Sequence, residues 1–157
     1  MMHRGFVAMA IAMCGTLASA ADRPVPYWAS VTAGDALMRT GPGRNYPAVW
    51  RYRRKGLPVK VLQVHESWRK VSDRDGTVGW VSAALLSAER TAIVVGEIRP
   101  MLASPEEGSR ILWRAAPGVI GKVRHCANGW CKFDVDGKSG FIASNGIWGI
   151  EPGEAID

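Results

Sequence analysis

The chain has 157 residues, of which 22% are charged and 8% aromatic, and its formal net charge is +6 at pH 7. This length accommodates two modules of about 60 residues each but leaves little room for one large core. The positive charge implies weak attraction to anionic surfaces. It does not specify nucleic acid as a partner, because a soluble surface held away from zero charge has the same signature.

The first 20 residues have the features of a secretory signal peptide. A short basic start, His3-Arg4, precedes an apolar run at residues 6–13, and residues 18–20 form an A-x-A cleavage signal. The run is shorter than the roughly 20 residues that span a bilayer. We therefore expect cleavage near Ala20/Ala21, a periplasmic protein and no stable membrane insertion afterwards. An uncleaved anchor is disfavoured, as is lipidation of Cys14, which no small residue precedes.

After an extended, proline-containing lead-in, the sequence repeats itself. Met38 and Trp50 are 12 residues apart, and so are Met101 and Trp113. A second tryptophan-to-glycine spacing is 11 residues in the first copy and 10 in the second. Because an internal repeat fixes the architecture, we expect two modules, at residues 28–87 and 92–150, joined by a short boundary.

Strand signals in the first module are short and bounded by turn residues. Residues 57–61 alternate apolar and other side chains, which is typical of a strand. Residues 68–71 follow a tight turn at Glu66-Ser67. Asp75-Gly76 predicts a hairpin before a returning strand at residues 77–82.

The second module repeats these signals and ends in an apolar tail. It begins with an apolar, β-branched segment at residues 92–95, and Asn128-Gly129 and Asp136-Gly137 predict two hairpins. The tail at residues 147–152 is apolar enough to dock on another surface. No stretch shows sustained helical periodicity, so the predicted fold class is all-β, with two tandem small barrels.

The first module resembles the bacterial SH3 (SH3b) family. The matching segments, in chain order, are Met38-Arg39-Thr40-Gly41-Pro42-Gly43, Tyr46-Pro47, Lys55-Gly56, Trp68-Arg69-Lys70-Val71, Asp75-Gly76 and Gly79-Trp80-Val81. The second module resembles the same pattern with losses, since Leu102-Ala103-Ser104 replaces Arg-Thr-Gly and Phe141 replaces Trp80. The resemblance implies an SH3-like, five- to six-stranded, partly open barrel per module and no cofactor. It also implies binding of cell-wall peptides or targeting of an enzyme to peptidoglycan.

Cys126 and Cys131 are the cysteines that remain after the predicted cleavage, and an oxidising compartment favours a disulfide between them. If Asn128-Gly129 forms a two-residue turn, the cysteines face each other with Cα atoms about 4.5 Å apart, which suits a disulfide. The closed loop is short, so we expect it to contribute about 1–2 kcal/mol. A redox-active pair and half of a zinc site that includes His125 are the rival interpretations.

Four residues of the first module are the candidate ligand contacts: Arg39, Tyr46, Trp50 and Trp68. If Val71 faces the core, Trp68 lies at or near the surface on the opposite face. Tyr46 and Trp50 lie in the predicted loop before the second strand. An aromatic shelf lined by loops is one way to hold an extended peptide. Alternatively, these rings cap the open ends of a small barrel or form the contact between the modules.

The basic run from Arg51 to Lys55 permits two interpretations. It faces an anionic glycan, lipid headgroup or peptide carboxylate, or it protects a strand edge from pairing with another sheet.

No catalytic motif is recognisable. The histidines of the mature chain, His65 and His125, stand outside any Gly-x-Ser-x-Gly or H-E-x-x-H pattern, and no cysteine has an evident base partner. We therefore expect a protein that is not an enzyme and that holds no metal or cofactor.

These observations predict an exported, non-enzymatic binding module whose partner is a cell-wall peptide or an extended segment of an envelope protein, and not nucleic acid. The first module is expected to bind and the second to act mainly as scaffold. The alternative is a structural or assembly subunit of an envelope complex, or a targeting accessory of a cell-wall hydrolase.

Overall fold

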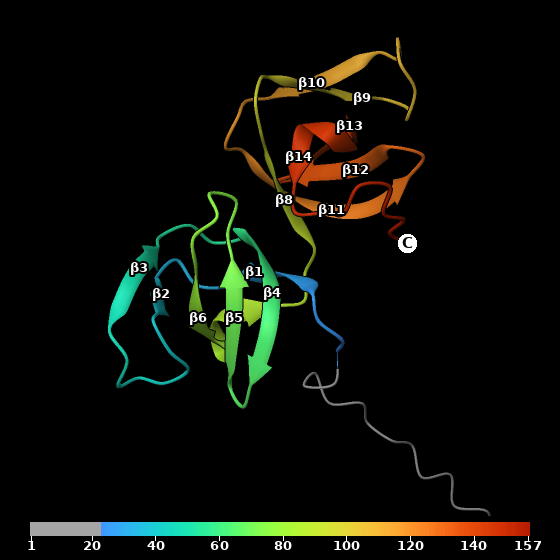
Figure 1. The fold of residues 1–157 in the computed structure, drawn as a ribbon. Helices are drawn as coiled ribbons and strands as arrows, with labels where there is room; N and C mark the ends of the chain where they lie inside the picture. The colour runs from blue at the N-terminus through green and yellow to red at the C-terminus, as the bar shows by residue number, and fades with distance from the viewer. Residues whose placement is uncertain (1–22) are drawn as a thin grey trace, which may run out of the picture.

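The computed structural model describes residues 23–157, which form two β-modules that follow one another along the chain (Figure 1). The predicted signal peptide and its cleavage site lie outside these residues. Among residues 23–157, no helix has both the length and the apolar character needed to cross a membrane.

Module 1 is a seven-stranded antiparallel sheet. Its strands are β1 (Tyr27–Val31), β2 (Ala36–Arg39), β3 (Ala48–Tyr52), β4 (Pro58–His65), β5 (Trp68–Ser72), β6 (Val78–Ser82) and β7 (Leu86–Ser87). They pair in the order β3-β2-β6-β5-β4-β1-β7. A single 3-10 turn, Ala83–Leu85, leads from β6 into β7.

Module 2 repeats this topology strand for strand. Its strands are β8 (Thr91–Val94), β9 (Arg99–Leu102), β10 (Ile111–Ala115), β11 (Ile120–Ala127), β12 (Trp130–Val135), β13 (Lys138–Ala143) and β14 (Ile147–Trp148). They pair in the equivalent order β10-β9-β13-β12-β11-β8-β14. The prediction of an all-β chain with two tandem SH3-like modules is confirmed. Each sheet has seven strands, more than the resemblance implied, because the short β7 and β14 pair with β1 and β8.

One element was predicted wrongly. Trp50, which was predicted to lie in a loop, lies on β3 at the edge of the sheet (Figure 1). Four of the five residues of β3 are exposed, and only Tyr52 is buried. Such an exposed strand lacks the alternation of buried and exposed residues by which a strand is recognised in sequence.

The two cores are built on the same register with different side chains. Met38 and Met101 occupy equivalent buried positions, at 0% and 2% exposure. Module 1 places Val59 near Val71, whereas module 2 places Gly121 against the larger Phe133. A Cβ atom on Gly121 would lie 2.5 Å from Phe133 Cζ, so the glycine is what admits the larger ring.

The modules pack directly on each other. Trp28 of β1 and Trp148 of β14 form an edge-to-face pair with ring centroids 4.7 Å apart. Glu151 in the tail accepts a hydrogen bond from Trp28 Nε1 at 3.1 Å. It also forms an ion pair with Lys60 Nζ at 2.6 Å. Thr91 Oγ1 donates to the carbonyl of Gly56 at 2.7 Å. The apolar tail therefore docks on the first module as well as on its own.

The predicted disulfide is confirmed. Cys126 and Cys131 pair directly across β11 and β12, with Cα atoms 4.1 Å apart. The backbone N–H and C=O of Cys126 bond instead to Ile156, at 2.9 and 3.0 Å. The cysteines therefore form a non-hydrogen-bonded pair, in which Cα atoms approach most closely.

The tail is also held by an ion pair. Arg90 donates from Nη1 and Nη2 to the two carboxylate oxygens of Glu154, at 2.7 and 2.9 Å, and from Nη2 to the carbonyl of Gly149 at 3.2 Å. The hydrogen bonds from Arg90 hold the pKa of the Glu154 carboxyl below its usual range. A bidentate pair of this kind is stronger than a neutral hydrogen bond.

Replacement of both cysteines, C126A/C131A, is expected to lower the free energy of unfolding by roughly 1–2 kcal/mol, because the unfolded chain regains the freedom of a short loop. Urea unfolding of the oxidised parent, the reduced parent and the double variant measures this loss. Equal stability of all three, or free thiols in the oxidised protein, would contradict the assignment.

The Glu154 carboxylate is expected to stabilise the fold above the ordinary carboxyl pKa, and this stabilisation is lost as the pH falls through its lowered pKa. The difference in unfolding free energy between the parent and E154Q should therefore be larger at pH 7 than at pH 3. A difference that does not change with pH would show that the pair with Arg90 does not carry the effect.

Candidate functional site

One groove on module 1 is lined by two of the four predicted ligand contacts. It is lined by residues from two parts of the chain: Asp35, Leu37, Arg39, Arg44, Trp68, Ser82, Ala84 and Leu85. We call it the Trp68 groove, and its volume is about 440 Å³. In the sheet, β6 lies between β2 and β5. The groove therefore spans three adjacent strands, with Arg39 on β2 and Trp68 on β5.

Trp68 reaches the groove through the alternation of β5. Arg69 and Val71 are buried, whereas Trp68 and Lys70 are half-buried on the opposite face. Trp68 pairs across the sheet with Ser82 of β6, the other wall residue at this level. The strand therefore presents one partly exposed indole while its neighbours form the core.

Arg39 and Tyr46 are joined by a hydrogen bond. Arg39 Nη1 donates to the carbonyl oxygen of Tyr46 at 2.7 Å, which ties the loop after β2 to the groove. The Tyr46 ring lies against Gly41, where a Cβ atom would stand 2.4 Å from ring carbons Cδ1 and Cε1. Glycine at this position is thus required for the ring to lie flat on the loop, with 41% of Tyr46 exposed.

Trp80 was not among the predicted contacts, yet it lies between two cations. It pairs with Lys70 on one side and with Arg39 on the other. The His65 ring approaches its edge, with centroids 6.3 Å apart. The alternation from buried Val81 is a signal that identifies Trp80 as outward-facing, whereas no sequence signal marks Arg44, which comes from a loop.

Trp50 lies outside the Trp68 groove. It is 51% exposed and lines a neighbouring hollow with Leu37 and Val49. Leu37 borders both spaces. The structure therefore brings Arg39 and Trp68 to one groove, attaches Tyr46 to Arg39, and leaves Trp50 on a separate surface of β3.

Two members of the basic run have partners. Arg51 pairs with Asp35 at 3.1 Å, and Arg54 Nη2 donates to the carbonyl of Gly118 in module 2 at 2.8 Å. Arg54 and Lys55 border a cleft of about 740 Å³ between the modules. That cleft also contains Lys122, Arg124, Glu89, Asp134 and Asp136. Its charge is mixed, so both interpretations of the run stay open.

The Trp68 groove carries one indole and two arginines. Across residues 23–157, no three His, Cys, Asp or Glu side chains gather closely enough to hold a metal ion. Tyr52 Oη donates to Asp73 at 3.1 Å, and burial, together with this carboxylate, raises the pKa of Tyr52. Tyr52 therefore stays protonated and anchors the turn at Asp73. The groove itself offers an indole for stacking and cations for a carbonyl or carboxylate.

Comparison with known proteins identifies relatives of this fold. The pattern described as "Bacterial SH3 domain" matches residues 33–88 and 95–149. The chain is 26% identical over 132 residues to the putative N-acetylmuramoyl-L-alanine amidase YrvJ of Bacillus subtilis (strain 168), an alignment that covers 73% of this chain and 25% of that protein. The chain thus spans about a quarter of the length of this curated relative.

Two solved structures are also similar. NlpC2 from Trichomonas vaginalis aligns with a TM-score of 0.36 at 13% identity, over 78% of this chain and 48% of that one. NlpC1 from the same organism aligns with a TM-score of 0.35 at 13% identity, over 80% of this chain and 46% of that one.

The variant R39A is expected to release the loop at residues 40–46, because it removes the hydrogen bond to the Tyr46 carbonyl. Amide hydrogen exchange in this loop should quicken by roughly three- to tenfold, the equivalent of about 0.5–1.5 kcal/mol for an exposed hydrogen bond. R44A, which removes a neighbouring cation, is the control. Unchanged exchange in R39A would show that the bond does not hold the loop.

Proposed function

Because the chain belongs to the bacterial SH3 domain family, we propose that it is an exported, non-enzymatic binding protein that recognises a cell-wall peptide or an extended segment of an envelope protein. The ligand lies in the Trp68 groove of module 1. Tyr46 and Arg39 support one side of it, and Trp68 stacks on its backbone or side chains.

The observation that carries this proposal is the position of Trp68. Its indole is half-buried in an open groove that is also lined by Arg39 and Arg44. Large aromatic side chains and arginines dominate binding energy where they border a desolvated pocket. A peptide would find stacking surface and hydrogen-bond donors in the same place.

The lack of the equivalent cation in module 2 supports a binding role for module 1. Arg39 pairs with Trp80, and at the same register position Leu102 pairs with Phe141. Leu102 is 5% exposed and lies on the face opposite the core residue Met101. We infer that module 2 is mainly scaffold, held by its disulfide and by the contact of Trp148 with module 1.

The similarity to a putative amidase supports a second candidate, an accessory that brings a cell-wall hydrolase to its substrate. The matched region is about a quarter of that relative, so the remainder of the relative has no counterpart in this alignment. In this alternative the Trp68 groove holds the wall and another surface holds the hydrolase. A stable partner protein without any wall binding would instead favour a structural subunit.

The variant W68A is expected to lower retention on purified peptidoglycan by roughly tenfold, because truncation of one central aromatic contact commonly costs about 1.4 kcal/mol or more. The measurement is a sedimentation assay with the purified protein over a range of peptidoglycan concentrations. W113A, which removes an indole that is 43% exposed on module 2, is the matched control.

Both variants must show the thermal unfolding transition of a folded protein. Retention that W68A leaves intact would sink the assignment of the groove. A parent protein that does not sediment with the wall would refute wall binding and leave an envelope protein as the partner, to be sought by co-purification.

A further inference from the structure

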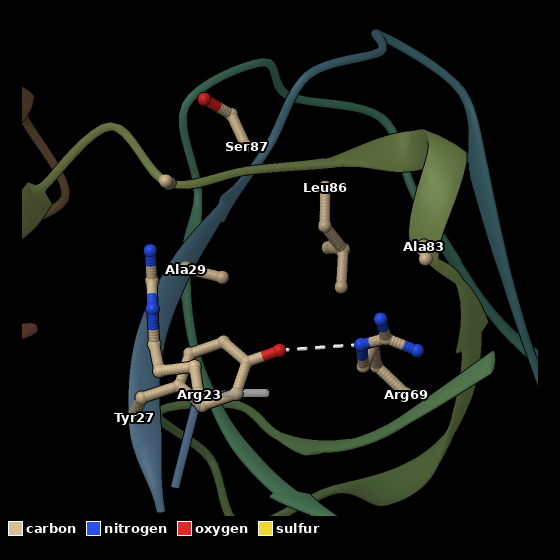
Figure 2. A pocket seen from close by; sticks show the side chains of 8 residues that line it. Arg23, Tyr27, Ala29, Arg69, Ala83, Leu86 and Ser87 are labelled. Carbon is tan, nitrogen blue, oxygen red and sulfur yellow. Dashed lines mark hydrogen bonds between the residues drawn. The ribbon is translucent and has the colours of Figure 1, made fainter. Parts of the chain in front are cut away.

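A small pocket of module 1 is lined by Arg69 of β5, whereas the preceding residue, Trp68, lines the Trp68 groove. Figure 2 shows the side chains around this pocket. Its lining includes Arg23, Tyr27, Ala29, Arg69, Leu86 and Ser87. Its volume is about 120 Å³, the space that about four water molecules occupy in the liquid. The pocket therefore fits a group of a few heavy atoms.

Arg69 is the unusual member of this pocket, because it is a charged residue only 8% exposed. Its Nε donates to Tyr27 Oη at 3.2 Å, and its Nη1 donates to the carbonyls of Glu66 and Trp68 at 2.8 and 2.9 Å. Within residues 23–157, no carboxylate pairs with it and Nη2 donates no hydrogen bond. Nη2 is not among the buried atoms that lack a partner, so this donor is open to the pocket and available to an anion that enters it.

A second cation borders the same space. The Arg23 guanidinium lies over the Tyr27 ring, with Cζ 4.9 Å from the centroid. Figure 2 shows the Tyr27 hydroxyl pointing to Arg69 along their hydrogen bond, with Ala29 and Leu86 also lining the pocket. The pocket thus combines two guanidinium groups with a small apolar wall.

The repeat shows what this place does in the other module. In β4 and β5, Val64 pairs with Arg69, and at the same register Cys126 pairs with Cys131. In module 2 the position of Arg69 is therefore occupied by a disulfide. Ile150 and Ile156 of the tail pack against that core, so module 2 is closed where module 1 is open.

The tail covers the edge of β11 in module 2, at the position that is open in module 1. Ile156 exchanges two backbone hydrogen bonds with Cys126, which adds a short strand to β11. Glu154 places its carboxylate on Arg90, which stands at the position of Tyr27. No described residue makes these backbone bonds to Val64, the counterpart of Cys126.

We propose that the pocket binds the free carboxylate at the end of an extended peptide whose last residue is small. The carboxylate takes the unused donors of Arg69 and is flanked by Arg23. The last side chain lies against Ala29 and Leu86, and the peptide backbone runs toward the open edge at Val64. This site is separate from the Trp68 groove and does not depend on the function proposed for it.

The test uses isotope-labelled protein purified after expression of the full chain. The probes are N-acetyl-alanyl-alanine with a free carboxylate and the same peptide as its C-terminal amide. Binding of each probe is measured by NMR titration. The free acid should bind at least tenfold more tightly than the amide and should shift the signals of Tyr27 and Arg69. R69Q should weaken binding by tenfold or more, and R23Q by a few-fold, whereas R110Q removes an exposed arginine of module 2 and should change nothing.

Several results would overturn the proposal. These are equal affinity for acid and amide, equal affinity of R23Q and R110Q, or shifts confined to Tyr46 and Trp68. Competition by inorganic phosphate with equal affinity would mean an unselective anion site and would refute peptide recognition. R23Q keeps the test valid if R69Q does not fold, because Arg23 is exposed. R44A, which removes a cation of the Trp68 groove that does not line the pocket, should leave this binding unchanged, so a failure of the groove is distinguishable from a failure of the pocket.

Discussion

The strict alternation of side chains along β5 places both candidate sites of this protein. Successive residues of a strand point to opposite faces of the sheet, so Trp68 enters the groove and Arg69, next to it, enters the pocket. A slip of one residue in register would exchange the two. The buried Val71 prevents that slip, because it anchors the strand in the core.

The two modules share the same strand pairing but fill equivalent positions with different side chains. Val59 and Val71 in module 1 correspond to Gly121 and Phe133 in module 2, where the smaller residue on one strand accompanies the larger one on the next. Interiors tolerate such volume-conserving exchanges while total volume and pattern are kept. Arg39 and Arg69 distinguish the modules in their chemistry, because the equivalent positions of module 2 hold Leu102 and the disulfide cysteine Cys131.

Much of the fold was predictable because turns and alternation leave local signals. The turn at Asn128-Gly129 set the register that brings the cysteines together, and both residues have positive φ. Residues whose position depends on distant packing left no such signal. Trp50 lies on an exposed edge strand, next to a register shift after Met38, and Arg69 reads in sequence as one more surface arginine. The predicted contacts Arg39 and Trp68 line the same groove because only β6 lies between their strands in the sheet. This proximity follows from the strand order, and their separation in the sequence gives no sign of it.

The C-terminal tail contacts both modules. Residues 150–157 seal the core of module 2 through Ile156, and through Glu151 they brace the first module at Trp28 and Lys60. Removal of this segment would therefore expose apolar surface of module 2 and also remove the contacts of Glu151 with module 1. The relative position of the two modules thus depends on the last few residues of the chain.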